Sequence, residues 1–183
     1  GCNESATVAY AFLVRESLPL WDLWERYFGS CPSGSAVPVV HSQATTPAGR
    51  QALRELISPF GGQLVSEAQT RLGDPRWNWL MVSMQLAVFR LAGEVVAPNG
   101  CPAHWVHLLS DTDAPAATCT EVHASLARSP GTSHAALIHG NWHPGPFAAP
   151  DVDAAVSPAA HTAQWVTLWM PHALALAADE CHL

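Results

Sequence analysis

The chain has 183 residues, 49% of them hydrophobic, and a formal net charge of −7 at pH 7. This length suits one domain with a substantial core, and the hydrophobic share excludes an intrinsically disordered chain. All eight basic residues are arginine, and an acidic chain without a basic face is not expected to bind nucleic acid or an anionic membrane surface. We therefore predict a single domain over residues 1–183.

The first half of the chain alternates between strand and helix patterns. The apolar run Thr7–Val14 predicts a strand. Ser17 is expected to cap a helix with Pro19 in its first turn, and the apolar residues of that helix recur at Leu20, Leu23, Trp24, Tyr27 and Phe28. The next elements are a strand at Val37–His41, a helix that opens at Thr46-Pro47 with Leu53, Leu56 and Ile57 on one side, and a strand at Gln63–Ser66.

The second half continues this alternation. It predicts a helix over Arg76–Ala97 with Ser83 as a candidate cap and Leu86, Phe89, Ala92 and Val96 as the inward stripe, then a short buried strand with its apolar run at Trp105–Leu109, and a helix at Ala116–Arg128. A strand at Ser133–His139, a loop insertion over 140–160, a strand at Gln164–Trp169 and a helix at Pro171–Asp179 follow. Such alternation implies an α/β fold, in which helices cover both faces of a mostly parallel sheet.

The stretch HWVHLLSDTDAP places Asp111 and Asp113 at the end of a predicted strand. Ligands of open α/β sheets collect at this end of the strands, so the two carboxylates are candidates for a binding site. An Asp-x-Asp pair can also hold a metal ion such as Mn²⁺, because carboxylate oxygens suit such cations. The alternative is that both residues only shape a turn and cap the next helix.

Five cysteines lie far apart without the paired spacing of zinc sites. Disulfides are their more natural role in an oxidising compartment, where two bridges and one free thiol are possible, but the sequence leaves the pairing open. Asn3-Glu4-Ser5 fits a glycosylation acceptor at Asn3. The chain shows no signal peptide and no apolar run of roughly 18 residues. We therefore expect a secretory or extracellular compartment, with the anchor or leader outside this chain.

Three other patterns bear on the function. The turn after the first strand has no GxGxxG, so a dinucleotide site is not supported. Ser110, His41 and Asp113 are conceivable hydrolase residues, but no GxSxG accompanies them. Trp77, with Trp79 and Met81, is expected to lie in the core, the alternative being that a tryptophan stacks on a sugar.

Several of these segments resemble, in the same order, the glycosyltransferase family of the core-2/I-branching β-1,6-N-acetylglucosaminyltransferases, their plant relatives and the peptide O-xylosyltransferases. The similar segments are VAYAFLVRESLPLWDLWERYF, VPVVHSQ, WNWLMVSMQLAVFRLAGEVV, LLSDTDAP and AQWVTLWMPHALALAAD. Three positions depart from the family pattern: Asn78-Trp79 replaces Trp-Gly, Asp111 stands where glycine or glutamate is commoner, and Ala163 replaces a glycine-serine lead.

The resemblance implies a Rossmann-like GT-A fold that binds a UDP-sugar and transfers GlcNAc or xylose, with inversion, to a glycan or protein hydroxyl, in the Golgi lumen. It implies donor contacts from Val14, Arg15, His41, Ser42 and Asp113, and a substrate cleft near Asp111, Trp77 and Trp165. The family generally works without a metal, so no cofactor is expected, and Mn²⁺ at Asp111 and Asp113 is the alternative.

The C-terminal part departs from the family in a further respect. The family's Asp-Glu-His segment and its diphosphate-binding basic residues follow the last helix, whereas this sequence ends at Asp179-Glu180-Cys181-His182-Leu183 and contains no lysine. We therefore expect a GT-A domain truncated at its C-terminus. Another chain would complete its site, or the protein is a noncatalytic structural or glycan-associated module.

Overall fold

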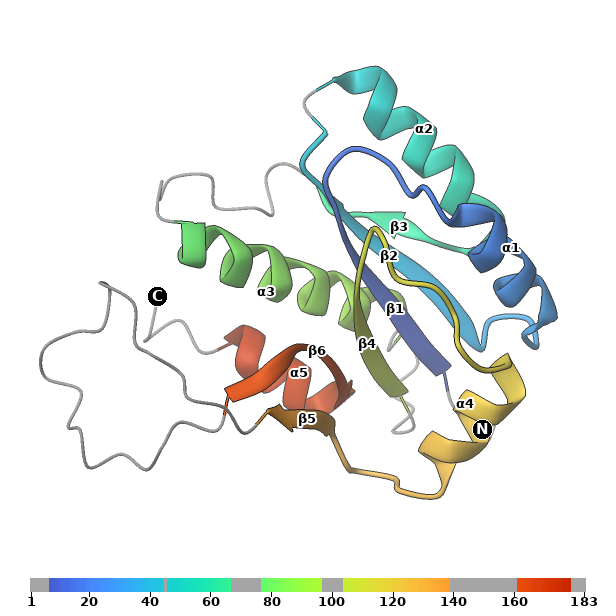
Figure 1. Ribbon diagram of the computed structural model, residues 1–183, viewed down its shortest axis with the longest axis vertical. Coiled ribbons are helices and arrows are strands. Elements are labelled where there is room, and N and C mark those ends of the chain that lie inside the picture. Colours follow the sequence, from blue (N-terminus) through green and yellow to red (C-terminus); the bar gives the residue numbers. More distant parts are fainter. Residues whose placement is uncertain (1–6, 45, 67–76, 97–103, 139–160, 179–183) are drawn as a thin grey trace, which may run out of the picture.

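The computed structural model describes residues 7–44, 46–66, 77–96, 104–138 and 161–178. Six strands form one sheet in the order β3-β2-β1-β4-β6-β5 (Figure 1). Their bounds are β1 Thr7–Val14, β2 Ala36–Ser42, β3 Gln63–Leu64, β4 His104–Ser110, β5 His134–Ile138 and β6 His161–Trp169. The first four strands run parallel, whereas β6 is antiparallel to β4 and β5 is antiparallel to β6. The predicted α/β class and mostly parallel sheet are confirmed, and the antiparallel edge was not anticipated.

Helices cover both faces of this sheet. They are α1 Trp21–Ser30, α2 Pro47–Ile57, α3 Trp77–Val96, α4 Cys119–Ala127 and α5 Met170–Ala178, with a short 3-10 turn at Ser58–Phe60. The buried residues of α1, α2 and α4 join one apolar cluster with the sheet, and those of α3 and α5 join another. Two apolar layers on opposite faces are the arrangement that a parallel sheet needs to keep its strands out of water.

The side chains of strand β1 alternate between these two apolar layers. Because successive side chains of a strand point to opposite faces, Tyr10 and Phe12 pack toward α1, while Ala9 and Ala11 pack toward α3. The two alanines are fully buried. Their small side chains leave room for the bulkier apolar stripe of α3, which includes Phe89 and was predicted correctly.

The start of α1 differs from the prediction. The helix begins at Trp21, its N-cap is Leu20, and no side chain caps it, so the cap predicted at Ser17 is wrong. The physical reason is that Leu18 is only 6% exposed and its carbonyl accepts from the N–H of Trp21 at 3.1 Å. The chain therefore makes a turn that buries Leu18 before the helix can begin.

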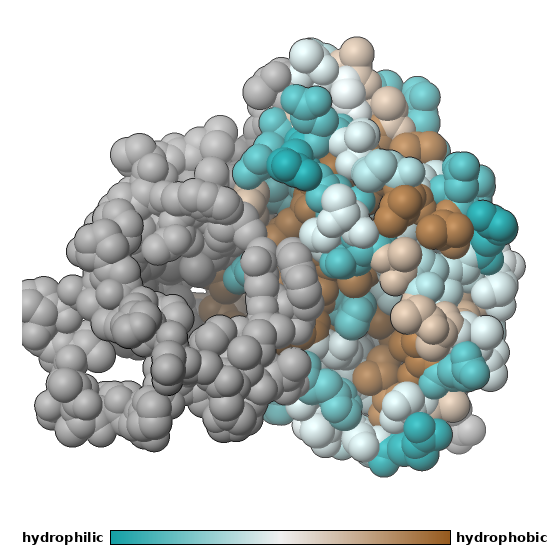
Figure 2. All heavy atoms as spheres, in the orientation of Figure 1, coloured by the Kyte–Doolittle hydropathy of each residue, from teal (hydrophilic) through white to brown (hydrophobic). Residues whose placement is uncertain are grey.

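The buried face of α1 also differs from the predicted stripe. Its core side chains are aromatic, while Leu23 is 39% exposed and faces away from the sheet. In α2, likewise, Leu56 of the predicted stripe is 38% exposed, whereas Leu53 and Ile57 are buried. Figure 2 shows hydrophobic residues interspersed with hydrophilic ones over the described part of the face in view.

The helix predicted over Arg76–Ala97 is confirmed within one residue at each end, but Ser83 as its cap and the predicted start of the next helix were wrong. Ser83 lies inside α3, which begins at Trp77. Helix α4 begins at Cys119 rather than Ala116, because Thr118 and Glu121 form a reciprocal capping box: the Thr118 hydroxyl accepts from the N–H of Glu121 at 3.3 Å, and the Glu121 carboxylate accepts from the N–H of Thr118 at 2.8 Å. The insertion predicted over 140–160 lies outside the described residues.

A disulfide joins Cys31, just after α1, to Cys119, the first residue of α4. The two Cα atoms are 5.5 Å apart, and the cysteines are separated by 88 positions in the chain. The sequence left this pairing open. In the part of the chain that the structure describes, no helix combines the length and the hydropathy needed to cross a membrane.

Candidate functional site

The sheet has a switch point between β1 and β4. From β1 the chain proceeds through α1 and α2 to β2 and β3 on one side, and α3 then returns it to β4 on the other side (Figure 1). The carboxyl ends of β1 and β4 lie together, because Leu13 pairs with Ser110. In open α/β sheets, the crevice outside this point is where ligands bind.

Two charged side chains meet at this switch point. The Nε of Arg15 lies 3.2 Å from Oδ2 of Asp111, and the backbone N–H of Arg15 donates to the same oxygen at 3.3 Å. The Arg15 side chain is 77% exposed and that of Asp111 only 13%. The Asp111 carboxylate therefore holds the Nε of Arg15, while the rest of the guanidinium remains exposed to solvent.

These two residues line a cavity of about 350 Å³. We call it the crevice. Its lining consists of Arg15, Glu16, Ser17, Pro19, Asp111 and Thr112. The loop after β1 supplies four of these residues and the loop after β4 supplies two. Sequence reasoning had proposed Arg15 and Asp111 but missed the others, although each is within four positions of one of those two.

Asp113 is used differently from Asp111. Its Oδ2 accepts from the N–H of Ser110 at 2.6 Å, and its carbonyl accepts from the indole N–H of Trp24 at 2.8 Å. The side chain of Asp113 therefore shapes the turn after β4, and its backbone is held by α1. The alternative, that these aspartates shape a turn and cap the next helix, is confirmed for the turn at Asp113 but wrong for the cap, because Thr118 is the cap of α4.

The two carboxylates are thus engaged with separate partners. Asp111 contacts Arg15, and Asp113 turns back to Ser110. Among the residues that the structure describes, no three His, Cys, Asp or Glu side chains are grouped closely enough to hold a metal ion.

The remaining donor candidates lie beside the crevice rather than in its lining. Val14 is 2% exposed and packs in the layer of α1, while its carbonyl accepts from the N–H of Gln43 at 2.9 Å. His41 and Ser42 are buried at the end of β2. The hydroxyl of Ser42 accepts from the N–H of Ala44 at 3.0 Å. These three residues therefore lie within the ends of β1 and β2 and do not line the crevice.

The other proposed site residues are less fully described. Trp77 is the first residue of α3 and Trp165 lies in β6, but their side chains lie outside the described part of the structure. Asn3 lies outside the described residues altogether.

The buried Arg50 is hydrogen-bonded to the backbone at the carboxyl end of β2 and just after β3. Its terminal nitrogens donate to the carbonyls of Ser42, at 3.4 Å, and Val65, at 2.7 Å. Burial, and secondly the positive charge of Arg50, lower the pKa of His41 to about 4. His41 is therefore neutral at physiological pH.

This pKa predicts an acid-sensitive fold. In the unfolded chain His41 takes up a proton near its ordinary pKa of 6.5, but in the folded chain only near 4. Its contribution to stability is therefore full above pH 6.5 and is lost as the pH falls toward 4. We expect about 2 kcal/mol of loss in unfolding free energy from this residue between about pH 7.5 and pH 5, measured by urea denaturation.

The His41→Gln variant should lose this part of the pH dependence, whereas His134→Gln, at an exposed position, should retain it. An equally steep decline in His41→Gln and in the parent chain would contradict the prediction.

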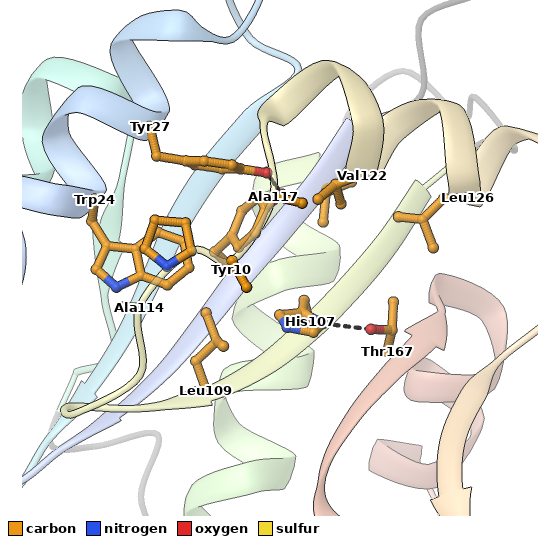
Figure 3. A pocket seen from close by; sticks show the side chains of 13 residues that line it. Tyr10, Trp24, Tyr27, His107, Leu109, Ala114, Ala117, Val122, Leu126 and Thr167 are labelled. Carbon is orange, nitrogen blue, oxygen red and sulfur yellow. Dashed lines mark hydrogen bonds between the residues drawn. The ribbon is translucent and has the colours of Figure 1, made fainter.

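A second cavity, of about 240 Å³, lies between α1 and α4 on one face of β1 and β4 (Figure 3). We call it the chamber. Tyr10, Trp24 and Tyr27 contribute aromatic rings, and Val122 and Leu126 of α4 line it as well. Sequence reasoning assigned the residues of α1 to the core and missed the chamber. The only signal was the unusual density of aromatic side chains in β1 and α1.

Comparisons with protein-family models and with curated sequences assign no family to this chain. No protein-family model matches the chain. No curated protein sequence matches it either. The resemblance to branching glycosyltransferases therefore stays a prediction from the sequence patterns.

Proposed function

We propose that the crevice binds the UDP part of a nucleotide-sugar and that the chain is a GT-A type glycosyltransferase domain. The observation that carries this proposal is the Arg15–Asp111 pair at the switch point between β1 and β4. A cationic group there meets the need of the reaction, because the departing diphosphate carries negative charge that must be stabilised. Arg15 is the arginine that lines the crevice.

Within this proposal the two residues have different roles. Asp111 accepts from Nε and the backbone N–H of Arg15, which fixes the direction of the side chain. The guanidinium then presents its terminal nitrogens to phosphate oxygens, for which its planar fork is well suited. Asp113 shapes the loop that carries Asp111 and is a positioning residue.

The reaction proposed is the inverting transfer of GlcNAc or xylose to a glycan or protein hydroxyl. The acceptor oxygen forms a bond to the anomeric carbon as the bond to the diphosphate breaks, and the acceptor's proton passes to a carboxylate. The Cys31–Cys119 disulfide supports a secretory compartment such as the Golgi lumen, because such bonds persist in oxidising surroundings.

Calorimetry with UDP, UDP-GlcNAc and UDP-xylose tests donor binding. We expect saturable binding of UDP that Arg15→Gln weakens by at least about tenfold, the effect of losing one charge-assisted hydrogen bond. Arg128→Gln, at an exposed position after α4, is the matched control and should bind as the parent chain does. A folded chain that binds no UDP would overturn the proposal.

Two further measurements distinguish the proposed metal-free enzyme from its alternatives. Binding that requires Mn²⁺ and is lost in both Asp111→Ala and Asp113→Ala would replace the metal-free site by a metal-dependent one. Binding of UDP-sugar without transfer to any acceptor hydroxyl would support the noncatalytic glycan-associated module, or a site completed by another chain.

A further inference from the structure

We propose that the chamber is a second binding site, specific for a small uncharged aromatic compound that carries one hydroxyl or N–H group. It is separate from the crevice, since none of the residues that line the crevice lines the chamber. The proposal therefore does not depend on UDP binding.

The walls of the chamber suit a flat ring. The ring centroid of Tyr10 is 5.6 Å from that of Trp24 and 5.4 Å from that of Tyr27, and both contacts are tilted or edge-on. Aromatic rings favour such tilted and edge-on contacts with one another. Val122 and Leu126 of α4 add aliphatic surface (Figure 3). A planar apolar guest can thus contact aromatic rings and aliphatic side chains at once.

The indole N–H of Trp24 is taken up by the carbonyl of Asp113, and the polar atoms of four other lining side chains form two neutral pairs. The hydroxyls of Tyr10 and Tyr27 are hydrogen-bonded to each other, and Nδ1 of His107 is hydrogen-bonded to the hydroxyl of Thr167. Two hydroxyls hold two hydrogens, of which their mutual bond uses one, so the tyrosine pair can donate the other to a ligand oxygen and can also accept. This is the reason for expecting one polar group on the ligand.

The electrostatics of the chamber exclude a charged ligand. None of its lining residues is Asp, Glu, Lys or Arg. Burial raises the pKa of both Tyr10 and Tyr27, and burial lowers the pKa of His107 despite the opposing effect of Asp113. All three side chains are therefore neutral near pH 7, and an ion placed here would lose its hydration without gaining a counter-charge.

The volume sets the size of the ligand. An apolar cavity of about 150 Å³ accommodates benzene. The chamber, at about 240 Å³, has room for a phenol or an indole. A sugar with many hydroxyls would leave most of them without partners against the apolar lining, which costs binding energy.

The test is calorimetry or ligand-detected NMR on the whole chain with phenol and indole as probes, and with benzoate as the charged control. We expect saturable binding of phenol or indole and none of benzoate. Val122→Phe, which fills the chamber from α4, should weaken this binding by at least about tenfold. Ala124→Phe, on the exposed side of the same helix, should leave it within about twofold of the parent affinity.

Ala117→Leu provides a second filling variant at an exposed position of the lining, in case Val122→Phe fails to fold, and it should weaken binding as well. Near-UV circular dichroism verifies the fold of each variant. Three results would overturn the proposal: no saturation with phenol or indole, unchanged affinity in a folded filling variant, or binding of benzoate or N-acetylglucosamine in preference to phenol.

Discussion

Replacing both Cys31 and Cys119 with alanine is expected to lower the free energy of unfolding by about 4 to 5 kcal/mol. The disulfide closes a loop that separates the two cysteines by 88 positions, and its loss returns that conformational freedom to the unfolded chain. Such a loss is comparable with the whole stability of many domains. The measurement is urea denaturation of the parent chain and the double variant.

A reducing agent provides the control for this prediction. It should lower the stability of the parent chain by at least the loss seen in the double variant, because complete reduction opens the Cys31–Cys119 bridge. The prediction fails if the parent chain keeps its full stability after complete reduction of the disulfide.

The second large effect is expected at Trp24. Trp24→Ala should lower the unfolding free energy by about 3 to 5 kcal/mol, as truncation of a large buried aromatic residue does. The side chain is 3% exposed. Its ring centroid is 5.0 Å from that of Phe12 and 5.7 Å from that of Phe28. Its removal therefore empties the centre of the layer between α1 and the sheet.

Two companion variants separate the contribution of burial from that of the indole hydrogen bond. Leu23→Ala, at the neighbouring exposed position, should cost less than about 1 kcal/mol. Trp24→Phe keeps a ring but loses the indole N–H that donates to the carbonyl of Asp113. It should have an intermediate effect and should speed amide hydrogen exchange in the loop after β4. Equal losses in Trp24→Ala and Leu23→Ala would refute the assignment.

This contact connects the core with the crevice. Trp24 holds the backbone at Asp113, and the same loop carries Asp111, which orients Arg15. The conformation of the crevice thus depends on Trp24, a core residue that does not line it. A weakened loop in Trp24→Phe would therefore also reduce UDP affinity if the proposed function holds.

The resemblance to branching glycosyltransferases pointed to Arg15 as a donor contact, and its place at a strand end pointed to Asp111. The resemblance grouped Arg15 with His41 and Ser42, which the structure buries at the end of β2 outside the lining of the crevice. Sequence spacing indicates which residues follow a strand. It does not indicate which of them turn outward, because that depends on partners such as Arg50, which donates to the carbonyl of Ser42.

The sequence by itself determined the α/β class and the greater part of the element pattern. Strand β1 was predicted with its exact bounds, and the buried stripe of α3 was predicted correctly. Both follow from local periodicity, since the alternation of a strand and the turn of a helix repeat within a few residues.

Only the tertiary structure decided the strand order, the antiparallel edge, the Cys31–Cys119 pairing and the chamber. It also brought Arg15 to Asp111 across 96 positions of the chain. These features depend on contacts between distant segments, which local patterns do not specify. They form because the apolar faces of helices and strands can all be buried together only in particular arrangements, and each arrangement selects which polar side chains meet at the strand ends.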